Sequence, residues 1–365
     1  SDTTTVVGGH HATMEPEGFA LPTVDIIVRG AGFPVIDQLI RAIEDGRDLA
    51  EINNIVIREA ESQTSTHYEP IESLDAFPRP ARGLTQEYRR KYRILGAPSP
   101  TALTVTSLGC PFRCDFCACW KMQGGEYLER DLADIVAELE TVQESSVFFG
   151  DDHTFYNVDR ARELCRRIKK RGIQKTFTAY ARADTIAENP ELIEEWSDAG
   201  LEALGVGYEA VSNDKLNSFG KRANLSTNEE AFRILDRCGV LNFAHFVVTQ
   251  DFTKSDFDRL YSYVDKWDLS MPFFTIQTPL PGTDLYTRRK NDITDNTFER
   301  FDLAHNVLPT KMGAEQFKKE YVSLYTRAYS IGRTLSLALK KFRPQEALLK
   351  LWFMRRLLRQ VRKLG

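Results

Sequence analysis

The sequence contains no long apolar run, no internal repeat and no low-complexity segment. Because no stretch of about 18 apolar residues occurs, we expect no membrane-spanning helix. The first residues, SDTTTVVGGHHAT, lack a basic region followed by an apolar run, so we expect no signal peptide. Gly and Pro, at 22 and 15 of 365 residues, do not indicate disorder. These absences favour a folded cytoplasmic protein, in which clustered cysteines usually serve metals or catalysis.

The net charge is small, at −4, but the charged residues are unevenly spread along the chain. From Thr326 to Gly365 there are eleven Lys and Arg residues against one acid, Glu346. Within this segment FMRRLLRQVRKL separates into an apolar and a basic side on a helical wheel. Such a helix can lie on an anionic inner membrane face, which would favour a lipid-like substrate, or pack on the protein with its basic side in water. The acidic body of the chain argues against nucleic acid as a partner.

Strand-like and helix-like segments alternate through the middle of the chain. Strand patterns rich in β-branched and aromatic residues are followed by amphipathic helix patterns with Pro starts and Gly stops. We expect strands in 101–108, 146–152, 174–184, 201–210, 240–250 and 271–283, and helices in 131–143, 158–172, 190–200, 227–239 and 254–267. The class is therefore α/β, with a partial (β/α)6 TIM-like barrel over about 100–288 whose site gathers at the carboxyl ends of the strands.

The two ends of the chain differ from this pattern. Residues 1–60 read as the second half of a small doubly wound α/β domain, and 61–99 as a linker. A half-sheet of this kind would leave one strand edge uncovered. Residues 289–365 read as a mostly helical, basic region.

Four of the six cysteines fall in the stretch SLGCPFRCDFCACW, directly after the first predicted barrel strand. A structural zinc site needs four ligands, usually in two separated pairs, and no cysteine pair elsewhere has zinc spacing. A cytosolic disulfide is disfavoured. Three cysteines on a cubic iron–sulfur cluster would leave one iron open, whereas four would suit electron transfer. Cys119 is expected to be a small buried residue, with a fourth ligand as the alternative.

The spacing Cys110-x-x-x-Cys114-x-x-Cys117, with Phe116 before the last cysteine, resembles the signature of the radical S-adenosylmethionine (SAM) superfamily. Further stretches resemble the branch that carries an N-terminal cobalamin-binding domain. They are VVGGHHAT, DIIVRGAG, FFGDDHTF, AYARADTI, LGVGYEAVSNDKL, FGKRANL and TPLPGTDLY.

The resemblance implies that Cys110, Cys114 and Cys117 hold a 4Fe–4S cluster whose open iron binds SAM. Reductive cleavage of SAM would then give a 5′-deoxyadenosyl radical that takes a hydrogen atom from a small-molecule substrate. A flavodoxin or ferredoxin type of protein would supply the electron.

The same resemblance suggests which residues bind SAM: Phe116, Asp151, Asp152, Arg182 and Glu209. For Phe116 the alternative is a core aromatic, for the aspartates a helix N-cap, and for Arg182 a surface ion pair. Gln277, at the end of the last barrel strand, is expected to face the substrate.

In the N-terminal segment, Gly8 and Gly9 match a loop that holds the nucleotide tail of cobalamin by close backbone approach. The segment begins at the strand before that loop, and the family's GEGE stands here as GAGF. Two alternatives therefore stay open: this half-domain binds cobalamin, or it has been repurposed and acts without cobalamin.

Cysteines are absent before Cys110 and after Cys238, where methylthiotransferases and many peptide-modifying relatives carry further clusters. The leading prediction is cobalamin-dependent methylation of an unactivated carbon. Cobalamin-free radical cyclisation, rearrangement or oxidation is an alternative. From another class, a non-catalytic iron–sulfur electron-transfer protein remains open.

Overall fold

The computed structural model describes residues 3–58, 62–75, 77–93, 100–220 and 224–341. Contacts divide the chain into two compact units. The first comprises Ser1–Pro80, Ser107–Asp131 and Leu280–Arg288, and the second comprises Ala81–Thr106, Leu132–Pro279 and Arg289–Gly365. Within the described residues, none of the helices has both the length and the apolar character needed to cross a bilayer.

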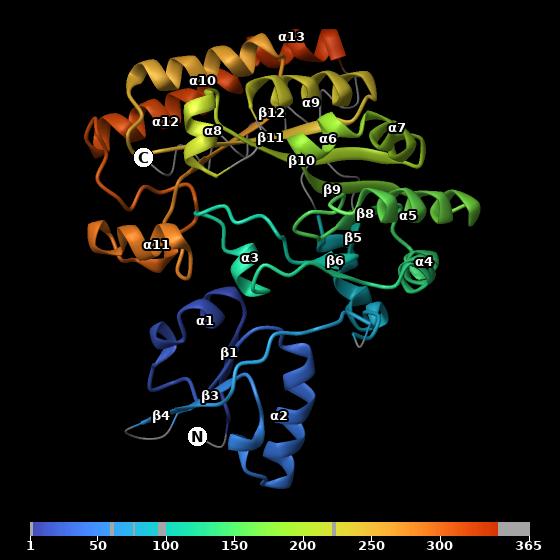
Figure 1. Cartoon of the computed structure of the whole chain (residues 1–365), viewed down its shortest axis with the longest axis vertical. Coiled ribbons are helices and arrows are strands. Elements are labelled where there is room, and N and C mark those ends of the chain that lie inside the picture. The colour runs from blue at the N-terminus through green and yellow to red at the C-terminus, as the bar shows by residue number, and fades with distance from the viewer. Residues whose placement is uncertain (1–2, 59–61, 76, 94–99, 221–223, 342–365) are drawn as a thin grey trace. The chain divides into compact units, whose positions relative to one another are not determined.

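The second unit is built on a six-stranded parallel sheet (Figure 1). Its order is β12-β11-β10-β9-β8-β5, so each strand lies beside the next one of the sheet along the chain. The strands are β5 (Thr101–Thr104), β8 (Ser146–Phe149), β9 (Thr176–Arg182), β10 (Leu201–Glu209), β11 (Leu241–Val248) and β12 (Met271–Ile276). This arrangement confirms the α/β class and the partial TIM-like barrel.

Helices connect successive strands of the sheet. A helix of this kind presents one apolar side to the core and its polar side to water. The helices are α4 (Leu132–Thr141), α5 (Val158–Lys170), α6 (Ala183–Glu188), α7 (Pro190–Asp198), α8 (Asn213–Ser218), α9 (Leu225–Arg237) and α10 (Lys254–Lys266). The sequence analysis did not predict the short helices α6 and α8. Trp196 of α7 contacts Phe149 and Phe177 on the sheet, with ring centroids 5.8 Å from each.

The predicted strand 101–108 is wrong as one element. It splits into β5 and β6 (Ser107–Leu108), and β6 pairs antiparallel with β7 (Leu128–Glu129). At the break, the backbone N–H and the hydroxyl of Thr106 donate to the two carboxylate oxygens of Asp151, at 2.7 and 2.6 Å. The Asp151 side chain therefore accepts the hydrogen bond that the Thr106 N–H would donate to a neighbouring strand if 101–108 were continuous.

After the sheet the described chain is mostly helical. It forms α11 (Asp284–Arg289), the 3-10 turns η4 (Lys290–Asp292) and η5 (Phe298–Arg300), α12 (Ala314–Ala328) and α13 (Ile331–Lys341). The amphipathic segment FMRRLLRQVRKL lies outside the described residues.

The first unit holds a small sheet of order β1-β2-β3-β4. Its strands are β1 (Val6–Gly8), β2 (Ile26–Val28), β3 (Ile55–Arg58) and β4 (Gln63–Ser65); β1 and β2 are parallel and the other pairs antiparallel. Around them lie α1 (His10–Met14), η1 (Pro16–Phe19), α2 (Phe33–Asp45) and η2 (Leu49–Glu51). The edge position of β1 leaves Val6 37% exposed. A further 3-10 segment, η3 (Arg82–Lys91), belongs to the second unit.

Candidate active site

The cysteine-rich loop connects β6 to α3 (Cys119–Met122) and is closed at its base by the β6–β7 pair. The Cys117 N–H and the Trp120 indole N–H both donate to the carbonyl of Cys114, at 3.2 and 3.0 Å. Gly109 has a φ of 88°, and a Cβ there would overlap the carbonyl oxygen of Glu126. Only glycine fits this position, so the loop has a defined entry.

All four cysteines of the loop are half-buried. Cys119 is therefore less buried than expected and forms the first residue of α3. Soft thiolate ligands suit an iron–sulfur cluster. Across the described part of the chain, no three Cys, His, Asp or Glu side chains form a metal-binding group. The ligand roles of Cys110, Cys114 and Cys117 therefore rest on donor chemistry and spacing, and they stay predictions.

The TPLPGTDLY segment anchors the same loop within the first unit. The N–H of Leu285 donates to the carbonyl of Asp115 at 2.9 Å, and the Asp115 carboxylate pairs with Arg288. On the other side of the loop, Lys121 Nζ lies 2.6 Å from Asp284 Oδ1. The sequence analysis assigned no role to these residues; the only signal was that Asp115 and Lys121 lie close to cysteines in the chain.

The two predicted cobalamin glycines lie at the end of β1, where Gly9 has a φ of 103°. No atom lies within 4 Å of a Cβ placed on Gly9, so its backbone is open to close approach. The hydroxyl of Thr13 donates to the Gly9 carbonyl at 2.8 Å and accepts from the Gly30 N–H at 2.9 Å. A side-chain hydroxyl thus joins the GGHHAT loop to the GAGF loop.

The carboxyl ends of the parallel strands carry the predicted SAM residues of the second unit. Asp151 is 2% exposed and both its oxygens bind Thr106, whereas Asp152 is exposed. Neither aspartate caps a helix, because the N-cap of α5 is Asn157, whose side chain accepts from the Arg160 N–H. The N-cap alternative is therefore wrong, and Asp151 instead joins two strand ends.

Arg182 ends β9 and binds Asp184 in a bidentate pair: Nε lies 2.9 Å from Oδ1 and Nη2 2.6 Å from Oδ2. The two side chains are only 11% and 16% exposed, so the alternative of a surface ion pair is wrong. The guanidinium is thus held in one orientation at the strand end.

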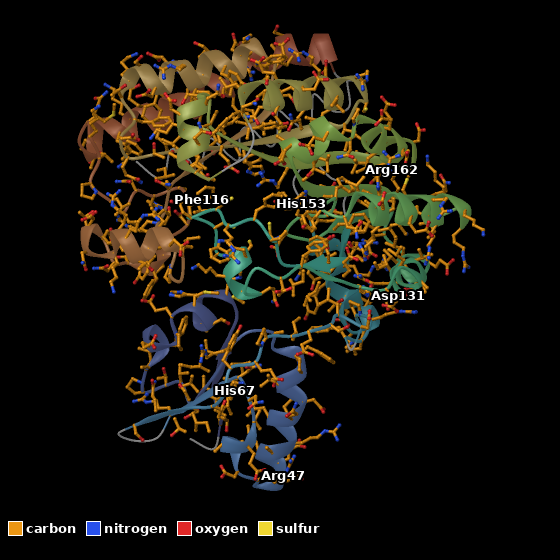
Figure 2. All side chains as sticks on the ribbon, viewed as in Figure 1. Arg47, His67, Phe116, Asp131, His153 and Arg162 are labelled. Atoms are coloured by element: carbon orange, nitrogen blue, oxygen red, sulfur yellow. The ribbon has the colours of Figure 1, made fainter. Side chains whose placement is uncertain are left out.

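Glu209 ends β10 with a φ of 63°, beyond an irregularity in the β10–β11 register. A non-glycine residue in the left-handed region is strained and is typical of functional sites. Gln277 follows β12; its N–H donates to Val248 at 2.9 Å, and its carbonyl accepts from the side chain of Gln250 at 2.8 Å. Phe116 is half-buried in the cysteine loop (Figure 2).

One strand-end histidine has no counterpart among the sequence predictions. His153, labelled in Figure 2, is 1% exposed, and its Nε2 lies 3.2 Å from the Thr185 hydroxyl. It sits in FFGDDHTF, two residues after Asp151, but nothing in that stretch distinguishes a site histidine from a core one.

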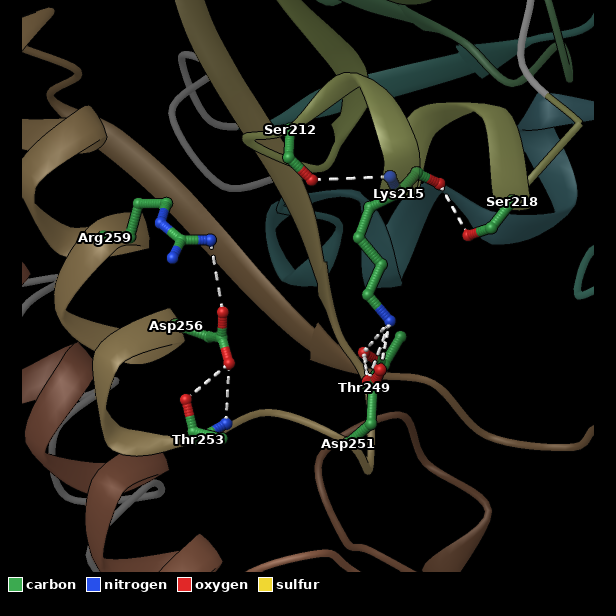
Figure 3. A network of polar contacts seen from close by, with 8 residues as sticks. All are labelled: Ser212, Lys215, Ser218, Thr249, Asp251, Thr253, Asp256 and Arg259. Atoms are coloured by element: carbon green, nitrogen blue, oxygen red, sulfur yellow. Dashed lines mark hydrogen bonds and ion pairs between the residues drawn. The ribbon is translucent and has the colours of Figure 1, made fainter.

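A second network orders the end of β11 (Figure 3). Lys215 of α8 binds both oxygens of Asp251, at 2.8 and 2.6 Å, and the hydroxyl of Thr249 at 3.2 Å. Burial alone would raise the pKa of Asp251, but hydrogen bonds from Lys215 and Thr249 hold it below its ordinary value. The network joins α8 to the strand end.

Comparison with known proteins identifies the central part of the chain. The pattern of the Radical SAM superfamily matches residues 104–264. A hopanoid C-3 methylase of Methylococcus capsulatus is 28% identical over 324 residues, covering 87% of this chain and 61% of that protein. An anaerobic magnesium-protoporphyrin IX monomethyl ester cyclase of Rubrivivax gelatinosus is 28% identical over 341 residues, covering 90% and 61%. The chain thus spans about three fifths of these relatives.

Two solved structures share the fold. The radical SAM methyltransferase TsrM from Kitasatospora setae, with cobalamin and a [4Fe-4S] cluster bound, has a TM-score of 0.68 at 19% identity, over 85% of this chain and 65% of that one. The cobalamin-dependent SAM radical enzyme OxsB, with aqua-cobalamin and SAM bound, has a TM-score of 0.70 at 16% identity, over 98% and 58%.

Proposed function

From the radical SAM domain that this chain carries, we propose that the protein cleaves SAM reductively and methylates an unactivated carbon of its substrate with the help of cobalamin. A 4Fe–4S cluster would supply the electron for this cleavage, and cobalamin the methyl group. Cys110, Cys114 and Cys117 would hold the cluster, and the loop's anchors at Asp115 and Lys121 would keep the three thiols in place.

The single observation that carries the proposal is the cysteine loop. Its three predicted ligands follow one strand, the loop enters through a glycine-only position, and the Cys117 N–H donates to the Cys114 carbonyl. For SAM we propose Phe116, Asp152, Arg182 and Glu209 as contacts. Asp151 would act through Thr106, which it binds with both oxygens.

Support for cobalamin comes from the N-terminal unit. The open backbone at Gly9, held to Gly30 through Thr13, fits a ligand that approaches the main chain closely. We propose four regions along the chain: a cobalamin-type half-domain at residues 1–60, a linker at 61–99, the radical SAM core at 100–288 and a helical region at 289–365.

Relatives named as methylases or methyltransferases favour methylation. Relatives named as cyclases favour a second candidate, radical cyclisation. The named relatives act on a hopanoid and on a magnesium-protoporphyrin ester, which supports a large, apolar ring compound as substrate, with Gln277 near it. A cytoplasmic flavodoxin or ferredoxin would donate the electron, and the segment FMRRLLRQVRKL, residues 353–364, would contact the inner membrane face.

Anaerobic reconstitution with iron, sulfide, SAM and dithionite tests the proposal. We expect 5′-deoxyadenosine or S-adenosylhomocysteine to form, and a cobalamin absorbance spectrum to stay with the protein through gel filtration. Formation of neither SAM product would exclude the enzyme function. Cleavage without retained cobalamin, and without transfer of label from methyl-labelled SAM, would favour the cyclase alternative.

A further inference from the structure

One face of the six-stranded sheet carries a row of apolar side chains that the helices do not cover. Alternate residues of a strand point to opposite faces. Phe149 and Phe177 contact Trp196 of α7, so their neighbours Phe148 and Thr178 face the other way. Tyr180, two residues beyond Thr178, shares that opposite face.

The same reasoning places two rings from the other half of the sheet. Phe246 of β11 contacts Tyr263 of α10, with centroids 6.4 Å apart, and Phe274 of β12 contacts Tyr325 of α12 at 5.0 Å. Their neighbours His245 and Phe273 therefore lie on the face away from these helices.

These side chains form one row, which we call the aromatic row: Leu103, Phe148, Tyr180, His245 and Phe273. Leu103 pairs in register with Phe148, and His245 with Phe273. The ring centroids of Phe148 and Tyr180 are 5.7 Å apart, those of Tyr180 and His245 6.1 Å, and those of His245 and Phe273 5.1 Å at an interplanar angle of 17°.

The row is continuous across β10 because Gly205 lies there, in register with Tyr180. A Cβ on Gly205 would overlap Cε1 and Cδ1 of the Tyr180 ring, so the ring lies over the strand and reaches towards β11. The row thus crosses all six strands, a span of about 24 Å at a strand spacing of about 4.8 Å.

This surface is mostly aromatic and partly accessible. Leu103 is 52% exposed and Tyr180 42%, while the other three side chains of the row are half-buried. No carboxylate or Lys/Arg side chain belongs to the row, and the nearby Arg182 is bound by Asp184.

We propose that the aromatic row is the substrate platform of this enzyme and takes a flat, uncharged, multi-ring compound that stacks on Tyr180, His245 and Phe273. Stacking on aromatic faces selects planar rings over flexible chains. A span of several strands exceeds a single six-membered ring, so the row fits an extended ring system. The inference rests on the proposed function, since it gives the substrate class of the same site.

The test measures binding of 1-pyrenemethanol to the reconstituted full chain by fluorescence anisotropy, with 1-dodecanol as an acyclic competitor. We expect Tyr180→Leu, which removes the ring but keeps an apolar side chain, and Phe273→Ala each to weaken binding about tenfold. Phe298→Ala is the matched control, because Phe298 is 48% exposed but belongs to η5 and not to a strand of the sheet. Equal affinity of wild type and both variants would overturn the platform, as would competition by dodecanol at the same concentration as pyrenemethanol.

Formation of 5′-deoxyadenosine or S-adenosylhomocysteine from SAM is measured in the same samples and separates the two proposals. If pyrenemethanol binding depends on the row but neither SAM product forms, the proposed function fails and the platform stands. If either product forms but the variants in the aromatic row bind pyrenemethanol as tightly as wild type, the platform fails and the proposed function stands. Circular dichroism of each variant checks its fold, and Tyr180→Phe, which keeps the ring, should bind as wild type does.

Discussion

Gly205 of β10 leaves the space that the ring of Tyr180 from β9 occupies, and the two residues are direct partners in the parallel sheet. The glycine makes the middle of the sheet flat enough for an aromatic side chain to lie across it. The ring then meets His245 from the strand on the far side of β10.

A methyl group at this glycine should displace the ring. We expect Gly205→Ala to lower the free energy of unfolding by about 1–3 kcal/mol, the usual cost of overpacking, and to weaken pyrenemethanol binding. Urea denaturation measures the first effect. Gly83→Ala is the control, because nothing lies within 4 Å of a Cβ at Gly83. Unchanged stability and binding in Gly205→Ala would show that the ring moves aside freely.

The cluster ligands can be separated from the fourth cysteine of the loop. Replacing Cys110, Cys114 or Cys117 with Ala should abolish iron and sulfide binding, because each removes one of three thiolates. Cys119→Ala should keep both, since Cys119 begins α3 and is outside the triplet. Iron and sulfide per chain are measured after anaerobic reconstitution. Loss of iron in Cys119→Ala would make it a ligand.

The pair between Asp115 and Arg288 should slow cluster loss by holding the loop. Arg288 is 54% exposed, and exposed ion pairs contribute less than about 1 kcal/mol, so we expect Arg288→Ala to speed cluster loss to a chelator by up to about fivefold. Decay of the cluster's visible absorbance measures this rate. The control is Arg289→Ala, whose partner Asp292 is three residues away in the chain. Equal decay in both variants would rule out the anchoring role.

Asp151 and Asp152 are neighbours in the chain, but their replacement should change stability by very different amounts. Asp151 is buried and accepts two hydrogen bonds from Thr106, so Asp151→Ala should cost about 2–4 kcal/mol. Asp152 is exposed, and Asp152→Ala should stay within about 0.5 kcal/mol. Urea denaturation compares the two variants. Similar losses in both would contradict the joining role of Asp151.

The Asp251 network predicts a pH-dependent contribution. Because the folded pKa of Asp251 lies below its ordinary value, its stabilisation is present above about pH 4 and is lost as pH falls through the lowered pKa. The stability difference between wild type and Asp251→Asn should therefore shrink between pH 6 and pH 3. A difference that grows as pH falls would reverse the assigned sign. Lys215→Met should show the same trend, since Lys215 is the partner.

Much of the fold could be predicted from local pattern. Each parallel strand and its main helix follow from apolar alternation and from Pro and Gly at helix ends, as at Pro190 and Gly200. The division of 101–108 into β5 and β6 could not, because it depends on Asp151, a residue 45 positions from Thr106.

In the candidate site, too, the sequence could not predict contacts that depend on the folded chain. Arg182 could be placed at a strand end, but its bidentate partner Asp184 was not foreseen, because the turn into α6 brings them together. His245 stacks half-buried on Phe273, a contact that the strand pattern could not indicate. A strand pattern does not say which face the helices cover, and that choice decides which side chains stay accessible.

By itself, the sequence determined the cysteine triplet, the order of strands and helices, and the glycines that need special backbone conformations, because these depend on residues close together in the chain. Only the tertiary structure decided that Leu103, Phe148, Tyr180, His245 and Phe273 form one row. Those residues come from five different strands, and their meeting depends on parallel register and on the helices that cover the opposite face. Register and face are set by long-range packing, which no local pattern records.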